Sequence, residues 1–563
     1  MLETLSFKAG AGPGSPNLVF PIDPSVTIFV GPNNSGKSLA LREIAMILGA
    51  GIDYGKTFVV DNLEYSALSE WEARAYLSAH TVRPSPGDLD LPPNQLDIRD
   101  NSGTFRVNSD QFVAAVQQPN MRTSQHRGIY ASWYGGRSIL SMDGPSRVML
   151  TNPQEMGDLK NADRPFARLL LDDRKREQLR RLILEATGLH FALDTTQGGH
   201  IRIRFGRTPP PNERSLEDPT IDYMREATAI EALSDGIKAF TGMLVQLHAG
   251  THKIVLVDEP EAFLHPSLAF KLGREIARGA VDEGKFIFAS THSPQFLMGA
   301  ISSGAKINVV RVTYDGGEGT ARLLRSADLT RMMRNPLLRS VGVLEGLFHS
   351  HVVVGEADAD RAFYQEINHR LTDASDQRGT LHTLFLNANG KHTIPAIVAP
   401  LRRLGIPAAA IADIDLLKLG GTELISQLDA IGVPKVEREA YQAKRRAVNA
   451  ALVEAQTRDY KLEGGLNLLT GDALEAADNL VNDLARYGLF VVPRGEIENW
   501  LDGLDIPRSK SSWLRQIFEA MGEDPRASNY VAPSDGDVWD FMGRVSDWLR
   551  DHRRRGMFSG ERC

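Results

Sequence analysis

Short apolar runs that end in glycine or polar residues recur in the first part of the chain. Residues 27–30 (TIFV), 254–257 (IVLV) and 286–289 (FIFA) are runs of this kind. Runs of this length without polar alternation are typical of buried strands. The run at 27–30 is followed by a glycine-rich stretch and then by apolar residues at helical spacing over 39–48, which predicts a strand, a loop and a helix.

A second series of apolar runs lies in the C-terminal part. Residues 352–354 and 408–412 are apolar and 383–386 (TLFL) is largely so, with helical patterns between them, and a further segment at 487–501 begins as a strand. Alternating strands and helices predict a parallel α/β sheet. Functional sites in such sheets gather at the carboxyl ends of the strands.

Two long stretches interrupt these patterns. Residues 52–225 contain Pro- and Gly-rich loops, a helical pattern at 162–189 and a strand-like alternation at 200–206. Residues 416–485 are helical, amphipathic and mixed in charge, which is usually a solvated face but could also contact DNA. Because no long heptad run occurs, we expect compact insertions, the first suited to dimerisation. The predicted fold class is α/β, with an N-terminal domain at 1–345 and a C-terminal domain at 346–563.

Composition narrows the class of protein. The 563 residues suffice for two or three domains, and the 42% hydrophobic and 24% charged content is ordinary for a soluble globular protein. A net charge of -7 gives no overall basic signature for nucleic acid, although a local basic channel remains compatible with it. One cysteine, Cys563, excludes a disulfide within the chain, and no signal-peptide or membrane-spanning pattern is present. We expect a cytoplasmic protein without membrane contact.

The glycine-rich stretch GPNNSGKS predicts a phosphate-binding loop, because it lies between a predicted strand and a predicted helix. Backbone N–H groups and the helix N-terminus supply positive potential there, Lys37 can reach the β- and γ-phosphates of ATP, and Ser38 can hold Mg²⁺. The nucleotide-binding residues predicted here are Gly31, Asn33, Asn34, Ser35, Gly36, Lys37 and Ser38.

The apolar run at 254–257 ends in Asp258 and Glu259. Asp258 can orient the Mg²⁺ shell, and Glu259 is placed to polarise a water for attack on the γ-phosphate. The run at 286–289 leads to His292, which can contact the γ-phosphate region. Ser234 and Gly236 begin a predicted helix just before the acidic strand, which is either an anion-binding geometry or a simple helix cap.

This order of phosphate loop, LSDG, acidic strand and histidine resembles the ABC-type ATPase core of SMC-like and DNA-repair ATPases. The resemblance implies that Ser234 serves the nucleotide of the opposite subunit, in a head-to-head homodimer that encloses two ATP molecules and could assemble further. GPNNSGKS and DEPEAFLHP are most similar to the ATPase half of the overcoming lysogenization defect (OLD) family. Gln117 and Gln118 are candidates for the glutamine that contacts Mg²⁺ in such ATPases.

Acidic residues follow the strands predicted in the C-terminal part. Glu356 and Asp360 come after 352–354, while Asp413 and Asp415 end the strand that begins at 408. Glu498 follows the strand at the start of 487–501. Carboxylates gathered at strand tips repel one another unless a cation joins them, and oxygen ligands without Cys or His suit Mg²⁺ or Mn²⁺. The predicted metal ligands are Glu356, Asp360, Asp413, Asp415 and Glu498, with Glu356, Asp413 and Asp415 as catalytic residues.

A Glu after the first strand and an Asp-x-Asp after a later one resemble a TOPRIM domain, and NANGKHTI and GEIENWL add to the likeness. ATPase and TOPRIM together resemble an OLD-family nuclease. The resemblance implies an ATP-regulated, metal-dependent DNA endonuclease in defence against phage, with a partner protein encoded in the same operon. One residue departs from the pattern: Ala357 stands where a glycine usually follows the first Glu.

Two other functions fit the same sequence. The protein could be an ATPase that senses a signal and holds an effector, with an inactive TOPRIM domain as scaffold, or an SMC-like repair ATPase that bridges DNA. Two basic segments are candidate phosphate contacts: Arg508 with Lys510, and the C-terminal group Arg550, Arg553, Arg554 and Arg555.

Overall fold

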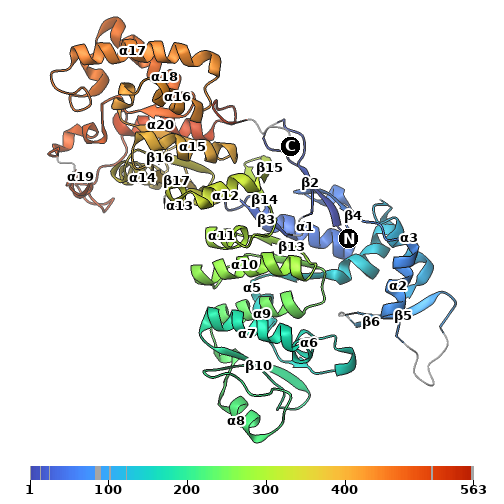
Figure 1. Ribbon diagram of the computed structural model, residues 1–563. Coiled ribbons are helices and arrows are strands. Elements are labelled where there is room, and N and C mark those ends of the chain that lie inside the picture. The colour runs from blue at the N-terminus through green and yellow to red at the C-terminus, as the bar shows by residue number, and fades with distance from the viewer. Residues whose placement is uncertain are drawn as a thin grey trace. The chain divides into compact units, whose positions relative to one another are not determined.

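The computed structural model describes residues 2–12, 14–23, 26–82, 91–100, 103–121, 123–340, 342–508 and 512–558 (Figure 1). The chain forms two compact units. Unit 1 contains Met1–Val30 and Asn34–Ser326, and unit 2 contains Gly31–Asn33 and Ala327–Cys563. Among the described residues, no helix is both long and apolar enough to cross a membrane.

A six-stranded sheet forms the centre of unit 1, in the order β15-β14-β3-β13-β12-β7. Its strands are parallel except β15, which pairs antiparallel with β14. The predicted apolar runs become three of the four inner strands, and their residues are mostly buried because helices cover both faces. The strands are β3 (Val26–Val30), β7 (Ile139–Met142), β12 (Ile254–Asp258), β13 (Phe286–Ser290), β14 (Asn308–Asp315) and β15 (Glu318–Leu324).

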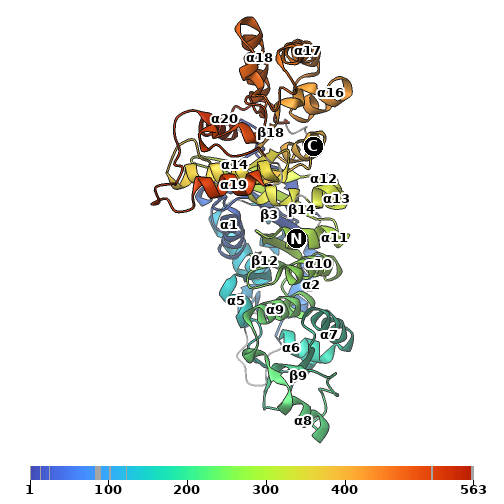
Figure 2. The ribbon, with the colours of Figure 1, turned by 90° about the vertical axis from the view of Figure 1, so that its left-hand side faces the viewer.

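Helices lie on both sides of this sheet. Figure 2 shows α1 (Lys37–Ala50) on one side of the strands and α10 (Pro266–Asp282) and α11 (Pro294–Ser302) on the other. The helix predicted after the phosphate loop is α1, and the helix that begins in LSDG is α9 (Asp235–Ala249), which precedes β12. The arrangement confirms the predicted α/β class.

The predicted insertion 52–225 contributes to the central sheet as well as to outer structure, because β7 lies within it and pairs with β12. In the first outer part, β4 (Val60–Tyr65) of the insertion joins an antiparallel sheet with β1 (Leu2–Phe7) and β2 (Val19–Pro21), which precede the insertion. After β4 come α2 (Glu70–His80), β5 (Gln95–Asp100), β6 (Gly103–Asn108), α3 (Ser109–Gln117), α4 (Ser124–Tyr130) and α5 (Gly144–Met149). The second carries β8 (Gln154–Glu155), α6 (Pro165–Leu171), α7 (Asp173–Thr187), β9 (His190–Asp194), β10 (His200–Gly206), α8 (Asp218–Glu226) and β11 (Thr228–Ala229).

Unit 2 is built on a four-stranded parallel sheet in the order β17-β16-β18-β19. The strands are β16 (His351–Gly355), β17 (Thr383–Asn387), β18 (Ala408–Ala412) and β19 (Leu489–Val491). All four correspond to the predicted strands. An aromatic core that includes Phe363, Tyr364, Trp513 and Trp539 packs against the sheet.

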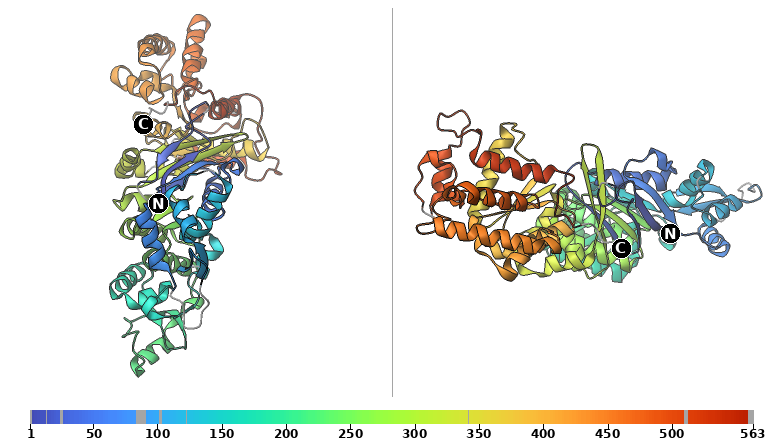
Figure 3. Two further views of the ribbon diagram at one scale, coloured as in Figure 1. Left: turned by 90° about the vertical axis from the view of Figure 1, so that its right-hand side faces the viewer. Right: turned by 90° about the horizontal axis from the view of Figure 1, so that it is seen from above.

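Helices complete unit 2. Those beside the sheet or near its ends are α12 (Ser326–Arg334), α13 (Pro336–Ser340), α14 (Asp358–Asp373), α15 (Ile394–Arg403), α19 (Trp513–Met521) and α20 (Asp537–Arg550). The predicted helical insertion appears as α16 (Gly421–Ala430), α17 (Arg438–Ala455) and α18 (Gly471–Ala485), which gather as the orange group in Figures 1 and 3. Between α17 and α18 the chain turns back towards the sheet, with a short helix at Gly465–Leu468.

Candidate nucleotide site and candidate metal centre

The loop between β3 and α1 has the backbone that its glycines allow. Gly36 is the N-cap of α1 with φ 94°, and Gly31 has φ 148°. Only glycine adopts such angles without strain, so the two glycines let the loop turn tightly into the helix. Asn34 and Asn33 are exposed, while Ser35 is buried. This is the backbone that a phosphate cradle at a helix N-terminus requires.

Lys37 is 3% exposed, and its Nζ donates to Ser35 Oγ at 3.3 Å. Burial lowers the pKa of Lys37 to about 8, although Glu259, Asp258 and Glu261 partly offset the shift. The site therefore holds a cation whose charge is poorly solvated. An anionic ligand such as a triphosphate would restore the favourable environment of that charge.

Ser38 and Asp258 meet although they are far apart in the sequence. Ser38 Oγ donates to Asp258 Oδ1 at 2.8 Å, and Ser290 Oγ donates to the same oxygen. The contact follows from the sheet, because β13 lies between β3 and β12 and pairs in parallel with both. A hydroxyl and a carboxylate in contact at this edge form a suitable pair of Mg²⁺ ligands.

Glu259 and His292 also lie together, with Glu259 Oε1 3.6 Å from His292 Nε2. Glu259 has φ 50°, an unusual backbone for a non-glycine residue, and its N–H donates to Ser290 O at 3.0 Å. Its side chain remains 49% exposed and can reach a water. Burial lowers the pKa of His292, and the charge of Lys37 acts in the same direction, so its imidazole is neutral near pH 7.

Sequence reasoning did not single out two residues at this site. Arg147 of α5 is 1% exposed and donates to the carbonyl of Glu259, which holds the strained turn in place. Glu261 accepts from the N–H of His292 at 2.7 Å, and burial raises its pKa. Glu261 follows the acidic pair closely and could have been found from the sequence, whereas no local pattern marks Arg147.

The candidate glutamines lie elsewhere on unit 1. Gln117 and Gln118 are exposed at the end of α3, and in the described part of the chain no hydrogen bond joins either to Ser38 or Asp258. The segment that runs beside the acidic strand is instead β7 itself, because Met142 at its end pairs with Val257 in the parallel register.

The LSDG segment begins α9 as the sequence predicted. Ser234 is its exposed N-cap, and its Oγ accepts from the N–H of Ile237 at 3.5 Å. Gly236 is buried, and a Cβ there would lie 2.5 Å from the carbonyl oxygen of Phe263. This glycine is therefore explained by close packing against the segment after the acidic strand, while Ser234 remains free to contact another molecule.

Three acidic residues converge in unit 2. One carboxylate oxygen from each of Glu356, Asp413 and Asp415 lies within 4.8 Å of the others. Glu356 follows β16 and Asp413 follows the neighbouring β18, so parallel pairing brings their strand ends together. The N–H of Asp413 donates to Glu356 Oε2 at 3.2 Å, which fixes the first carboxylate relative to the second. We call this group the acidic centre.

The other two predicted ligands flank the acidic centre. Asp360 lies in the first turn of α14, and Oδ2 accepts from the N–H of Ala357 at 2.6 Å. Burial, together with the charges of Glu356 and Glu498, raises the pKa of Asp360 to about 7. Glu498 lies in the short helix Ile497–Asn499 and is close enough to act on Asp360, but neither residue belongs to the three-residue group.

Two lysines pair with the acidic centre. Lys391 Nζ lies 2.6 Å from Asp415 Oδ2, and Lys461 Nζ lies 2.5 Å from Asp413 Oδ2 and 3.9 Å from Asp415 Oδ2. Burial nevertheless raises the pKa of Glu356 and of Asp413, with nearby carboxylates contributing in each case. The lysines therefore compensate only part of the negative charge. Lys461 was not anticipated from the sequence.

The residues present suit a hard divalent cation. Asp413 Oδ1 and Asp415 Oδ1 are buried and have no hydrogen-bond partner among the described residues. A buried carboxylate oxygen without a partner is costly unless a ligand satisfies it. The donor set is made of oxygen atoms alone, which Mg²⁺ and Mn²⁺ prefer.

The alanine that departs from the TOPRIM pattern is accommodated without strain. Ala357 has φ −127° and ψ 174°, an extended conformation open to any residue. The close approach between β16 and α14 occurs two residues earlier, at Gly355, where a Cβ would lie 3.0 Å from the Cβ of Asp360. The glycine that packs β16 against α14 is thus present.

Arg508, Arg550 and Arg554, which were candidate phosphate contacts, make contacts within the chain. Arg508 donates to the carbonyl of Leu462, and Lys510 lies outside the described residues. Arg550 pairs with Asp547 at 3.2 Å, and Arg554 donates to the carbonyl of Leu549 at 2.8 Å. These arginines therefore take part in the fold near α20.

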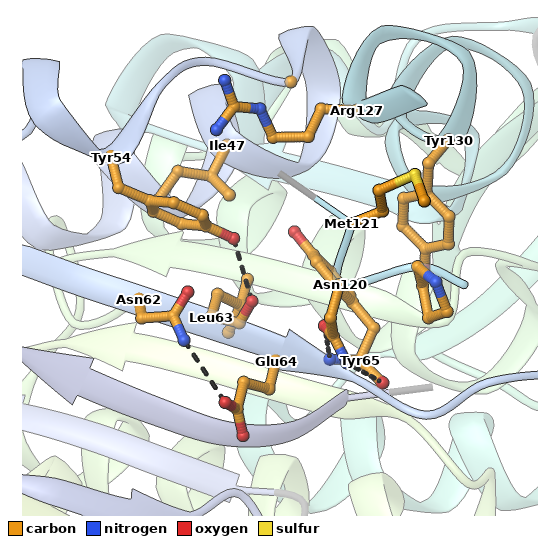
Figure 4. Close-up of a pocket in the computed structure, with 12 residues that line it drawn as sticks. Ile47, Tyr54, Asn62, Leu63, Glu64, Tyr65, Asn120, Met121, Arg127 and Tyr130 are labelled. Carbon is orange, nitrogen blue, oxygen red and sulfur yellow. Dashed lines mark hydrogen bonds between the residues drawn. The ribbon is translucent and has the colours of Figure 1, made fainter. Parts of the chain in front are cut away.

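A cavity of about 230 Å³ lies in unit 1 between the C-terminal end of α1, β4 and the α3–α4 segment (Figure 4). Its polar groups largely bind one another. Asn120 accepts from the N–H of Tyr65 at 2.9 Å and donates to its carbonyl at 2.9 Å, and Tyr54 donates to Leu63 O at 2.9 Å. The cavity adjoins the opposite end of α1 from Lys37, so it is separate from the nucleotide site.

Comparison with known proteins assigns both parts of the chain. Residues 161–298 match the family described as "AAA domain, putative AbiEii toxin, Type IV TA system". Residues 347–415 match "Overcoming lysogenization defect protein-like, TOPRIM domain", a range that includes all three residues of the acidic centre. The chain therefore carries an ATPase-type segment followed by an OLD-like TOPRIM segment. The predicted OLD resemblance is therefore confirmed, and nucleotide and divalent-metal use follow for the two domain types in general.

Solved structures similar to this chain include heads of SMC proteins. An SMC head bound to the C-winged helix domain of ScpA is 14% identical, with 59% of this chain and 99% of that chain covered and a TM-score of 0.33. The SMC head domain from Thermotoga maritima is 14% identical, with 57% and 99% covered and a TM-score of 0.28. Likenesses at this level carry no argument about function. No curated protein sequence matches the chain.

Proposed function

We propose that this OLD-like protein is an ATP-regulated DNA endonuclease that depends on a divalent metal. One observation carries the proposal: Glu356, Asp413 and Asp415 converge at neighbouring strand ends, with buried carboxylate oxygens that lack partners among the described residues. Such a group is suited to cation binding rather than to a scaffold. Its position in an OLD-like TOPRIM domain points to phosphodiester cleavage.

The residues of the acidic centre would each have a defined task. Glu356, Asp413 and Asp415 would hold the metal, and Asp360 and Glu498 would complete the ligand set. The N–H groups of Asp413 and Ala357 orient Glu356 and Asp360 respectively. A bound Mg²⁺ or Mn²⁺ supplies positive charge that stabilises the attacking and leaving oxygens of a phosphodiester.

ATP would bind in unit 1 and control the nuclease. Lys37 would hold the β- and γ-phosphates, and the Ser38–Asp258 pair would hold Mg²⁺. Glu259 would orient the attacking water, while neutral His292, whose Nε2 lies 3.6 Å from Glu259 Oε1, would contact the γ-phosphate region. Because Ser234 is exposed at the start of α9, we include a head-to-head homodimer in which it reaches the partner's nucleotide, with assembly into a higher oligomer allowed.

The substrate, the biological process and a further partner are proposed from the OLD-like class of protein that this chain resembles. We propose DNA as the substrate, defence against phage as the process, and an operon-encoded protein as a further partner. We retain 1–345 as the ATPase domain and 346–563 as the TOPRIM nuclease domain. The insertions at 52–225 and 416–485 belong to these two domains respectively.

One experiment tests the proposal against its rivals. Purified protein is incubated with supercoiled plasmid and Mg²⁺ or Mn²⁺, with and without ATP, and nicked and linear products are quantified. We expect metal-dependent cleavage that changes with ATP. ATP hydrolysis without cleavage under every condition would favour an ATPase with a scaffold TOPRIM domain, whereas DNA bridging without cleavage would favour an SMC-like repair ATPase.

A further inference from the structure

We propose that Lys461 is a resident counter-ion of the acidic centre, which pairs with the same aspartates that would bind the metal and competes electrostatically with the incoming metal. The inference rests on the proposed metal centre. It assigns a residue of the helical insertion to the nuclease site, although the mixed-charge sequence around it is typical of a solvated surface.

The contacts of Lys461 are those of a central cation. Its Nζ lies 2.5 Å from Asp413 Oδ2, 3.9 Å from Asp415 Oδ2 and 3.9 Å from Glu496 Oε2. The three acids come from two separate segments of the sheet edge, and Glu496 is 3% exposed. A single ammonium that reaches three carboxylates acts as the shared cation that their mutual repulsion requires.

The backbone of Lys461 is held against this edge. Gly495 has φ 107°, and a Cβ there would lie 2.1 Å from the carbonyl oxygen of Lys461. Asn499 Nδ2 donates to the same carbonyl at 3.3 Å. The segment that contains Glu496 and Glu498 therefore packs closely against the backbone of Lys461. A glycine is required at position 495 because a side chain there would collide with the Lys461 carbonyl.

The turn that carries Lys461 is also braced from within the insertion. The carboxylate of Glu463 accepts from the N–H of Thr457 at 2.8 Å and of Asp459 at 2.8 Å. Leu466 N–H donates to Pro493 O at 2.8 Å, and the adjacent Tyr460 is fully buried. Because the turn is fixed by these contacts, it holds the backbone of Lys461 in a defined position beside the acidic centre.

In each of the two aspartates, one carboxylate oxygen pairs with a lysine and the other does not. Lys461 and Lys391 pair with Oδ2 of Asp413 and Asp415, whereas Oδ1 of both residues is buried without a partner among the described residues. A bound metal and the Lys461 ammonium would therefore contact the same two carboxylates, those of Asp413 and Asp415. Like charges in one site repel, so entry of the metal must weaken the Lys461 contacts.

The test measures Mn²⁺ binding to the full chain by calorimetry at pH 8, together with the metal-free melting temperature. Lys461→Met keeps the length of the side chain and removes its charge. We expect Mn²⁺ to bind about tenfold more tightly or better, while the metal-free protein melts at a lower temperature. Lys461→Arg should behave like the wild type.

Lys418→Met is the matched control, because Lys418 pairs with Asp459 of the same turn at 2.9 Å and is 43% exposed. Its Mn²⁺ affinity should be unchanged. Should Lys461→Met fail to fold, the double variant Asp413→Asn/Lys461→Met should recover the fold, because it removes the acid together with its counter-ion. A double variant that stays unfolded would show a purely structural lysine and overturn the inference.

The outcomes separate the inference from the function on which it rests. If wild-type protein binds no Mn²⁺ in a manner that Asp413→Asn abolishes, the metal centre fails and the competitor role fails with it. If wild type binds Mn²⁺ but Lys461→Met binds with unchanged or weaker affinity, the metal centre stands and the competitor role is overturned.

Discussion

The nucleotide site and the acidic centre organise charge in opposite ways. In the nucleotide site a buried cation, Lys37, comes from one continuous motif, and burial lowers its pKa to about 8. At the acidic centre the buried groups are carboxylates from separate segments, and burial raises the pKa of the flanking Asp360 to about 7. Each site is thus pushed towards neutrality and is relieved by a ligand of the opposite charge, a triphosphate in one and a divalent cation in the other.

The comparison also shows how each site is assembled. The phosphate loop is shaped by its own glycines and by the start of α1, so most of its contacts are local. The acidic centre needs parallel pairing of β16 with β18 and a turn from the insertion. Variants that disable one site should therefore leave the assembly and ligand binding of the other intact, which is the basis of the predictions below.

The largest effect is expected in the acidic centre. Asp413→Asn removes a metal ligand and should reduce plasmid cleavage by about a thousandfold or more, with ATP hydrolysis unchanged. Asp358→Asn is the matched control, because Asp358 is exposed after the neighbouring strand β16 and pairs only with Arg361 in the described contacts. Loss of ATP hydrolysis in Asp413→Asn would show that the two sites are not separable.

The mirror-image variant lies in unit 1. Glu259→Gln should retain ATP binding and reduce hydrolysis by about a hundredfold, because the amide cannot polarise the attacking water. Lys37→Ala should abolish tight ATP binding itself. Both are measured by nucleotide-binding titration and phosphate release, and a wild-type hydrolysis rate in Glu259→Gln would remove that residue from the catalytic role.

Mixing variants tests whether the nucleotide site is shared between subunits. Lys37→Ala and Ser234→Arg proteins should each be inactive in hydrolysis, and after subunit exchange the mixture should recover part of the activity, because each heterodimer contains one intact composite site. Absence of recovery, with exchange verified by mass spectrometry of the mixed dimer, would argue for sites complete within one subunit.

A smaller effect concerns pH. The folded-state pKa of Asp360 is about 7 and lies above its ordinary value, so the metal-free protein gains stability at low pH that is lost as pH rises through 7. The metal-free melting temperature should therefore fall as the pH rises from about 4 to about 7, between the unfolded and folded pKa values of this group, and level off above that. Added Mn²⁺ should cancel the decrease, and Asp360→Asn should flatten it. A melting temperature that rises over this range in the wild type but not in Asp360→Asn would contradict the assignment.

The smallest effect is expected at Ala357. Since its backbone is extended, with φ −127°, Ala357→Gly relieves no strain and should change cleavage by less than about twofold. Initial rates on plasmid DNA measure this directly. A large gain in rate would mean that the alanine impairs the site in a way that its backbone conformation does not explain.

Much of this architecture could be predicted from the sequence. The apolar runs at 27–30, 254–257 and 352–354 became buried parallel strands, because such runs fit no other short element as well. The acids after β16 and β18 then had to approach one another, since parallel neighbours end at the same edge. The phosphate loop was also recognisable, because its chemistry is contained in eight successive residues.

Tertiary structure decided the rest. Arg147 reaches the turn at Glu259 across 112 residues, and Lys461 enters the acidic centre from a helical insertion. Periodicity locates a residue on its own element but not against a distant one, so neither contact had a local signature. Likewise, Ala357 raised a concern that only its dihedral angles removed. The sequence determined which charges lie at the strand ends, whereas packing between distant segments decided which cations meet them.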